Sequence, residues 1–141
     1  MAEYGVANPA NLSALDTSLS VPAGGTWTSG NGVDLLDATA NLLGELEVQI
    51  SVTGGATDGY DIEVIAQYSE DNTNWPDDGD PDAIVYSKAD SAGGASITRS
   101  PTVPIGTPTA RYARLQYKNN NATDAVTVTS KYTIRKGKDS T

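Results

Sequence analysis

The chain of 141 residues contains no cysteine, no histidine and no phenylalanine. Without cysteine it forms neither a disulfide framework nor a thiolate metal site, which suits assembly in a reducing cytosol. Without histidine, the Ser-His-Asp and Cys-His catalytic arrangements and the common histidine metal sites are excluded as well. No run approaches the roughly 18 apolar residues of a membrane span. The N-terminus also lacks a basic start followed by an apolar stretch, so we expect no secretory signal.

Basic residues are missing from the first 87 positions, which carry fifteen acidic side chains. All nine lysines and arginines follow, with only three acids, so the two parts carry −15 and +6 and sum to −9. Such a split indicates either that the halves neutralise each other in the fold or that they face different partners. The overall negative charge argues against general binding to nucleic-acid phosphates.

Several segments alternate between apolar and polar residues with the period of a β-strand. In residues 45–52 every even position is apolar, and in residues 60–68 the even positions are again expected to point inward. Glycine and aspartate at 54–59 form a turn, so we expect these two segments to be an antiparallel pair with acidic outer faces. Residues 112–117 and 126–135 alternate too, with basic outer positions. If acidic and basic strands are neighbours, cross-strand pairs offset much of the charge split.

Shorter strand candidates lie near residues 18–21, 26–28, 32–36, 83–87 and 95–99. Three prolines in 101–108 exclude a central strand there. Residues 37–43 are the only segment that could form a helix, and this segment is too short to change the fold class. The sequence therefore predicts an all-β fold, a single β-sandwich or jelly roll of about eight antiparallel strands.

We divide the chain into an extended N-terminal arm (1–20), a β-sandwich domain (21–136) and a C-terminal tail (137–141). In the arm, turn-forming residues break any period and scattered leucines are the only anchors. The arm packs on its own domain or on a neighbour, and a frayed terminus is the alternative.

The acidic residues give little support for a catalytic or metal site. A glycosidase needs two acids on opposite sides of a bond, but Glu45, Glu47 and Glu63 fall on expected solvent faces of strands. Four further acids, Asp77, Asp78, Asp80 and Asp82, could hold a calcium ion through oxygen ligands. Their spacing does not match an EF-hand, and the flanking prolines favour a stiff, solvated loop over a metal site. We therefore expect no enzyme and no cofactor.

The two tryptophans allow two interpretations. Trp27 and Trp75 could be stacking platforms for sugars, but a tryptophan more often caps the open end of a sandwich core. We favour the cap for both residues.

Three segments share a pattern across residues 20–135. The first, 26–35, reads Thr-Trp-Thr-Ser-Gly-Asn-Gly-Val-Asp-Leu; the second, 62–75, is a strand followed by Ser-Glu-Asp-Asn and a Trp; the third, 111–115, reads Arg-Tyr-Ala-Arg-Leu. Together they resemble a group of small β-sandwich virion proteins of tailed bacteriophages and prophages, usually head decoration (cement) proteins or other accessory structural proteins. The Asp-rich insertion after Trp75 departs from that pattern. Discoidin-like and carbohydrate-binding sandwiches share the second and third motifs.

The resemblance implies a non-enzymatic decoration protein that binds the outer surface of a phage head and stabilises the shell, assembled in the host cytoplasm. Its expected partners are the major capsid protein and further copies of itself, with a trimer as the guess, and no nucleic acid or membrane. The alternative is a glycan-binding module of a tail fibre or cell-surface protein. We select as candidate partner contacts Leu12, Leu15, Arg135, Lys136 and Lys138.

Overall fold

The structure is a computed structural model that describes residues 12–37, 39, 41–53, 60–90, 98–99 and 102–135. These residues form an all-β fold of twelve strands without a helix. The strands are β1 (Ser13–Val21), β2 (Trp27–Ser29), β3 (Val33–Asp34), β4 (Leu36–Asp37), β5 (Leu42–Leu43), β6 (Glu45–Thr53), β7 (Tyr60–Ser69), β8 (Ala83–Asp90), β9 (Thr98–Arg99), β10 (Thr102–Pro104), β11 (Tyr112–Asn119) and β12 (Val126–Arg135). Among the described residues, none belongs to a helix that could cross a membrane.

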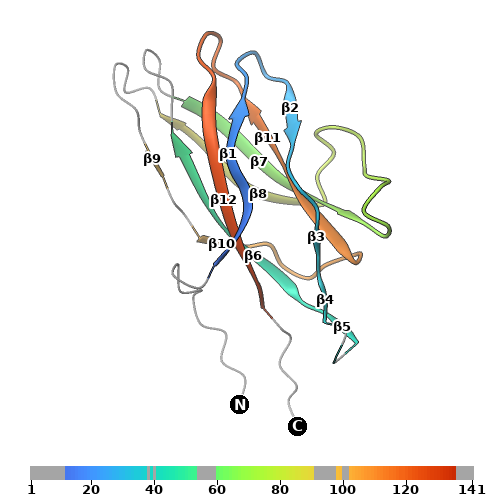
Figure 1. Cartoon of the computed structure of the whole chain (residues 1–141). Coiled ribbons are helices and arrows are strands. Elements are labelled where there is room, and N and C mark those ends of the chain that lie inside the picture. The colour runs from blue at the N-terminus through green and yellow to red at the C-terminus, as the bar shows by residue number, and fades with distance from the viewer. Residues whose placement is uncertain are drawn as a thin grey trace.

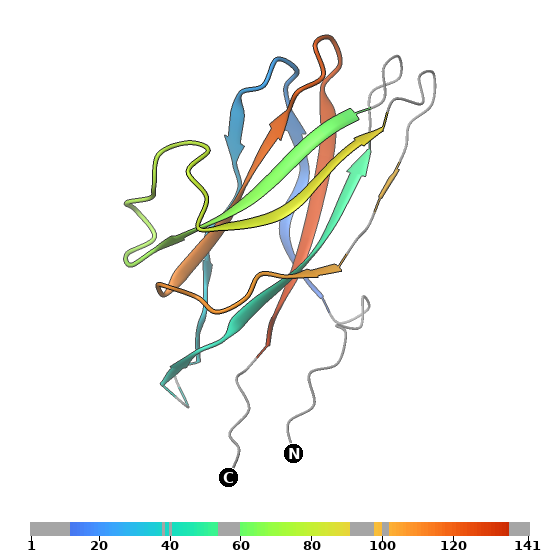
Figure 2. The same ribbon diagram turned by 180° about the vertical axis from the view of Figure 1, so that it is seen from behind.

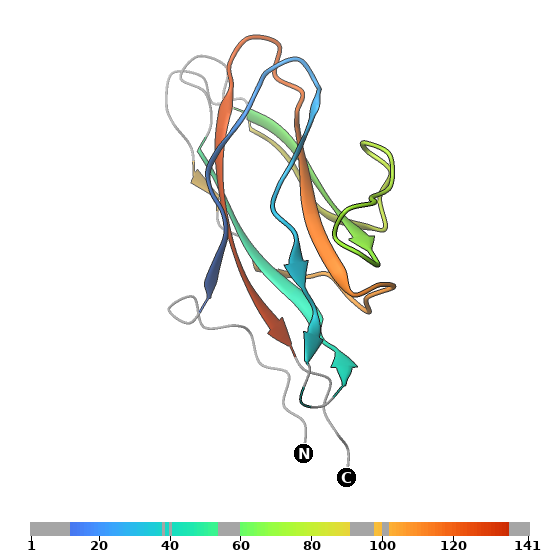
Figure 3. The ribbon, with the colours of Figure 1, turned by 45° about the vertical axis from the view of Figure 1, so that its right-hand side comes forward.

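The strands form two main antiparallel sheets that face each other (Figures 1 and 2). The first sheet has the order β1-β12-β6-β10, and β9 also pairs with β6. The second sheet has the order β2-β11-β7-β8, and β3 also pairs with β11. Strands β4 and β5 pair with each other as a small hairpin beside the end of β12 (Figure 3).

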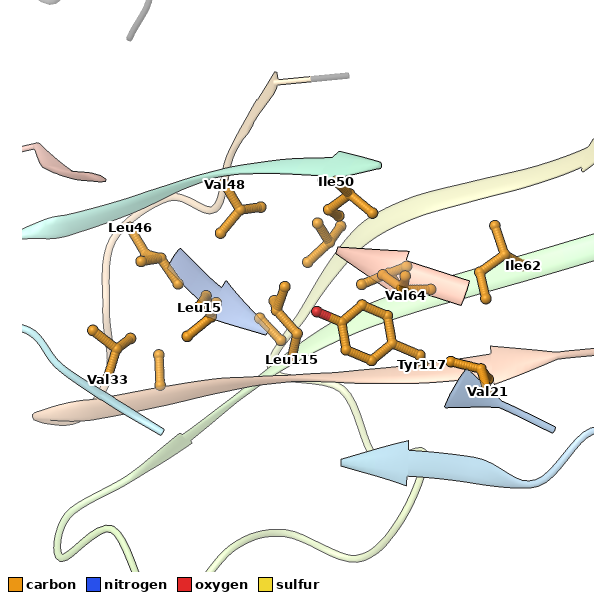
Figure 4. Packing of buried hydrophobic residues seen from close by; sticks show 14 of the residues in the cluster. Leu15, Val21, Val33, Leu46, Val48, Ile50, Ile62, Val64, Leu115 and Tyr117 are labelled. Atoms are coloured by element: carbon orange, nitrogen blue, oxygen red, sulfur yellow. The ribbon is translucent and has the colours of Figure 1, made fainter. Parts of the chain in front are cut away.

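The apolar faces of the two sheets meet in one hydrophobic core (Figure 4). Its central strands contribute the buried side chains Leu46, Val48, Ile50, Val52, Ile62, Val64, Ala66, Ala113, Leu115 and Tyr117. The inward positions predicted within 45–52 and at residues 62–68 are thus confirmed, and the side chain of Tyr60 lies outside the described residues. Burial of each of the larger aliphatic side chains stabilises the fold by about 1.5–3 kcal/mol.

The expected hairpin between residues 45–52 and 60–68 is wrong. Strand β6 lies in the first sheet and β7 in the second, so the two strands face each other across the core instead of pairing edge to edge. Both strands are apolar on their even positions. Pairing within one sheet and packing across the core between two sheets both bury these positions. The strands that pair with them come from the C-terminal end of the chain, where β12 pairs with β6 and β11 with β7.

This pairing places an acidic strand beside a basic strand in each sheet. In the second sheet Lys118 is in register with Glu63, and its Nζ lies 2.9 Å from Glu63 Oε2. In the first sheet Arg135 Nη2 lies 3.2 Å from Glu47 Oε2. Cross-strand pairs between an acidic and a basic strand are therefore present in both sheets. Because the Lys118–Glu63 pair is partly exposed, it contributes to register more than to stability.

Glu47 was expected to be solvent-exposed, and this is wrong, since it is only 4% exposed. Strand β6 is an inner strand, with Thr133 of β12 on one side of Glu47 and Pro104 of β10 on the other. The Arg135 guanidinium lies close to the carboxylate as well. An outward position on an inner strand is thus covered by its neighbours.

The predicted arm is described only from residue 12 onward, and residues 1–11 lie outside the described residues. From Ser13 to Val21 the segment is β1, an edge strand of the first sheet that pairs with β12. The register shifts twice along this pair, and Ser18 has a positive φ of 47°. The segment therefore packs on its own domain.

The helix considered for residues 37–43 is also wrong: the described residues of this segment form a hairpin. Asp37 ends β4, and its Oδ1 accepts the backbone N–H of Thr39 at 3.1 Å. Asn41 has a positive φ of 54°, and β5 follows directly. Asp and Asn stabilise turns in this way, which explains a hairpin in place of a helix.

A buried carboxylate ties the two sheets together. Asp16 on β1 is 2% exposed, and its Oδ2 accepts the hydroxyl of Tyr117 on β11 at 2.7 Å. Its Oδ1 accepts the backbone N–H of Asn31 at 2.7 Å, and Ser130 Oγ donates to Oδ2 at 3.2 Å. Burial, followed by the negative charge of Asp16, raises the pKa of Tyr117 well above its ordinary value. The hydroxyl therefore stays protonated and available as a donor.

We predict that Asp16→Ala lowers the free energy of unfolding. The substitution removes the acceptor of the buried Ser130 hydroxyl and one acceptor of the Tyr117 hydroxyl. A buried donor left unsatisfied costs about 1–3 kcal/mol. Urea denaturation measures the loss, with Ser20→Ala on the exposed side of the same strand as the control. Equal effects of the two substitutions would contradict the role of Asp16.

Candidate functional site

The most elaborate polar arrangement lies on the outer face of the second sheet. Residues 70–82, here called the acid loop, connect β7 to β8 and project from the side of the second sheet (Figure 3). The loop contains the four acids considered as calcium ligands, and their side chains are exposed. It was expected to be a stiff, solvated loop, and the structure agrees: the acids are exposed and the backbone is fixed to the sheet beneath it.

Two buried glutamines hold the acid loop in place. Gln67 Nε2 donates to the carbonyl oxygens of Asp77 at 2.8 Å and Asp80 at 3.0 Å. Gln116 Oε1 accepts the backbone N–H of Gly79 at 2.9 Å, and its Nε2 donates to Asp78 Oδ1 at 2.9 Å. An amide side chain suits this task because it donates and accepts at once without carrying charge.

Each tryptophan lies beside a cation on this same outer face. The guanidinium carbon of Arg114 is 4.6 Å from the ring centroid of Trp75, and Lys118 Nζ is 5.0 Å from that of Trp27. Arg114 also donates two hydrogen bonds to Gln67 Oε1, at 3.0 and 2.9 Å. The arginine thereby links Trp75 to the glutamine that fixes the loop.

The expected role of the tryptophans as caps of the core is wrong. Among the described residues, the core cluster includes neither Trp27 nor Trp75. Trp27 pairs in register with Lys118, which occupies an outward position on β11. Gly79 lies against the edge of the Trp27 ring, and an added Cβ there would be 2.4 Å from Nε1. With its positive φ of 78°, this position strongly favours glycine.

The Ser-x-Asp-Asn motif forms the turn that ends β7. Asp71 Oδ1 accepts the backbone N–H groups of Asn74 at 2.8 Å and Thr73 at 2.9 Å. The Asn74 side chain donates to Oδ2 at 2.7 Å, and Ser69 Oγ donates to Oδ1 at 3.0 Å. These bonds, led by the backbone amide of Asn74, hold the pKa of Asp71 well below its ordinary value. The turn gives the acid loop a fixed starting point.

The acids of the loop do not converge. In the part of the chain that the structure describes, no group of three or more acidic side chains lies close enough together to hold a metal ion. Asp78 accepts from Gln116, and Asp82 Oδ2 accepts the backbone N–H of Tyr68 at 2.7 Å. The arrangement fits a clamp that positions a loop, and it does not support the calcium interpretation.

The candidate partner contacts separate into three groups. Leu15 is buried in the core, whereas Leu12 is half-buried at the start of the described chain. Arg135 lies at the end of β12 and pairs with Glu47. Lys136 and Lys138 lie outside the described residues.

We predict that Gln67→Met loosens the acid loop. Methionine keeps the approximate volume but removes two donors to the loop and the acceptor of Arg114, which lowers the free energy of unfolding by about 1–3 kcal/mol. Hydrogen exchange at Gly79 and Asp80 should become faster. The matched control is Gln49→Met, a half-buried glutamine on the outer face of the first sheet. Unchanged hydrogen-exchange rates at Gly79 and Asp80 in Gln67→Met would contradict the role of Gln67 in holding the acid loop.

Asp71 also predicts a pH dependence. Because its pKa is lower in the folded than in the unfolded chain, ionised Asp71 contributes stability above the ordinary aspartate range, and this contribution is lost as the pH falls through and below that range. The difference in unfolding free energy between the wild type and Asp71→Asn should therefore shrink between pH 7 and about pH 2.5. Denaturation curves at both values test this, and a constant difference would contradict it.

No protein-family model matches the chain, and neither the curated proteins nor the solved structures contain a significant match.

Proposed function

We propose that the protein is a bacteriophage head decoration (cement) protein that binds the outer surface of the shell and stabilises it. The observation that carries this proposal is the strand order. If β2 with β3 and β9 with β10 each count as one interrupted strand, the two sheets have four strands each, in the orders β1-β12-β6-β10 and β2-β11-β7-β8. This order supports our proposal of an eight-stranded jelly roll, an architecture found in viral capsid proteins and in lectins. The sequence motifs at 26–35, 62–75 and 111–115 favour the virion protein.

A structural role agrees with how the polar groups are used. Asp34 forms a bidentate pair with Arg111, at 3.0 and 2.8 Å, and Glu63 pairs with Lys118. The side chain of Gln67 serves the acid loop and Arg114, and that of Gln116 serves the loop and Ser29. These groups hold strands and loops in position, so we propose a protein without enzymatic activity or cofactor.

The proposed partner is the major capsid protein, bound on the outer surface of the head after synthesis in the host cytoplasm. Many identical sites on a symmetric shell suit a small protein present in many copies, and a homotrimer at a local three-fold position is the proposed assembly. The net charge of −9 supports an assembly without a nucleic-acid partner.

The glycan-binding alternative has weaker support. Trp27 and Trp75 lie on the outer face of one sheet, as a sugar platform requires, but each ring is already stacked with a cation. The loop acids, which would help through calcium, do not converge among the described residues. A glycan array with and without a chelator distinguishes this alternative, and a calcium-dependent signal would favour it over the shell protein.

We predict that the purified protein binds phage heads that lack it, at a fixed number of copies per head. Sedimentation of heads with increasing protein, followed by quantification of the bound fraction, measures the saturation. Heads that already carry the protein are the control, because their sites are filled. Binding that does not saturate would reject the decoration function.

A further inference from the structure

The acid loop contains an Asp-Gly dipeptide, Asp78-Gly79, at the centre of a tight turn. Asp80 donates its backbone N–H to the carbonyl oxygen of Asp77 at 3.0 Å, which closes the turn around the dipeptide. The positive φ of 78° at Gly79 is that of the third residue of a type II turn. A side chain at this position would also meet the Trp27 ring. The fold therefore requires glycine after Asp78.

An Asp-Gly dipeptide is prone to isomerise, because glycine has no Cβ to keep its backbone nitrogen away from the preceding side chain. The Gly79 nitrogen attacks Cγ of the protonated Asp78 carboxyl group. The N–Cγ bond forms, and the N–H proton and the carboxyl hydroxyl leave together as water. Water then opens the resulting succinimide at either carbonyl carbon. One product is aspartate, and the other is isoaspartate, in which the main chain runs through the side-chain CH2.

Gln116 holds both of the groups that would react. Its Oε1 accepts the Gly79 N–H at 2.9 Å, and its Nε2 donates to Asp78 Oδ1 at 2.9 Å. The second Nε2 proton is donated to Ser29 Oγ at 2.9 Å, which fixes the orientation of the amide. Because the Gln116 side chain is fully buried, water does not readily replace a partner that it loses.

Ring closure is incompatible with these hydrogen bonds. The succinimide nitrogen carries no hydrogen, so the bond from Gly79 to Gln116 is lost as the N–Cγ bond forms. An isoaspartate would then add a main-chain CH2 between the carbonyl groups of Asp77 and Asp80. Gln67 Nε2 donates to these two oxygens at 2.8 and 3.0 Å. The intermediate and the product therefore both disturb the partners of buried amides, and a buried polar group left unsatisfied is costly.

We propose that Asp78-Gly79 is a latent isomerisation site, which Gln116 keeps in the aspartate form by holding the Gly79 nitrogen and the Asp78 carboxylate. This inference is independent of the proposed function. In the folded chain isoaspartate should form at Asp78 about tenfold more slowly than in the unfolded chain, since ring closure gives up a buried hydrogen bond. Gln116 then preserves the covalent structure of the acid loop as well as its position.

The first experiment measures isoaspartate formation in the folded wild type and in the wild type unfolded in guanidinium chloride, at the same pH and temperature. Asp58-Gly59, the second Asp-Gly of the sequence, is the internal reference, because both dipeptides should isomerise at similar rates in the unfolded chain. Chymotrypsin cleaves after Tyr60 and Tyr68 and so places them on separate peptides. Labelling with isoaspartyl methyltransferase and mass spectrometry give the yield on each peptide. Equal yields at Asp78 in the folded and unfolded chains would overturn the proposal.

The second experiment compares two glutamine variants to separate the effect of Gln116 from the general rigidity of the acid loop. Gln116→Met removes the acceptor of Gly79, so isoaspartate at Asp78 should form about tenfold faster in the folded variant, with the yield at Asp58 unchanged. Gln67→Met is the matched control, because it loosens the loop but leaves Gln116 in place, and its effect should be smaller.

Two results of this comparison would overturn the role of Gln116. One is equal acceleration in the two variants, which would assign the protection to the loop as a whole. The other is an unchanged rate in a Gln116→Met protein that keeps the circular dichroism spectrum of the wild type. If Gln116→Met does not fold, Gln116→Asn takes its place, since asparagine keeps the amide but is one CH2 too short to hold both groups.

Discussion

The fold depends on one constraint: the apolar sides of β6 and β7 face each other across the core. These strands follow one another in the sequence but belong to different sheets, so neither provides the hydrogen-bonding partner of the other. Each has one neighbour that comes late in the chain, β12 beside β6 and β11 beside β7. The distribution of charge agrees with this requirement, because the early strands are acidic and the late strands basic. The charge split of the sequence is thus a consequence of which strands become neighbours.

The same arrangement leaves two different outer faces. On the second sheet, the acid loop covers the polar positions of β7 and β11, and the glutamines beneath it are fully buried. On the first sheet, the outer positions of β6 and β12 carry mainly threonine, serine and glutamine with a few charges. A loop with many carboxylates can be fixed in place because its anchors are backbone carbonyl oxygens and neutral amides. Its acids are then left to project into solvent, where their charge costs little.

The sequence predicted the strands better than their partners. Alternation identified the inward residues of β6 and β7 because period two is a local property. It did not identify the sheet to which each strand belongs, since pairing within a sheet and packing across a core bury the same residues. Glu47 was misjudged for the same reason: whether an outward residue is covered depends on the strands beside it.

The candidate site was less predictable still. The loop acids and both tryptophans stood out in the sequence, but Gln67 and Gln116, which organise them, did not. One signal was available: the outward positions Ile65, Gln67 and Ser69 are uncharged, unlike Glu63 on the same strand, and uncharged outer residues suggest a covered face. Asp16 lies in the segment interpreted as an arm, where turn-forming residues break any period. Only the three-dimensional structure shows that a hydroxyl from the opposite sheet makes its burial tolerable.

The position of β11 and β12 has a consequence for synthesis on the ribosome. Both strands lie inside their sheets, β12 between β1 and β6 and β11 between β2 and β7, although they are the last strands of the described chain. A nascent chain that ends before residue 112 therefore lacks β12, which joins β1 to β6, and β11, which joins β2 to β7. Strands β6 and β7 can pair with β10 and β8 earlier, but they cannot acquire their neighbours β12 and β11 until residues 112–135 have been synthesised. Folding is then a late, concerted event, and an incomplete product lacks the central strand pairing that a stable subunit requires.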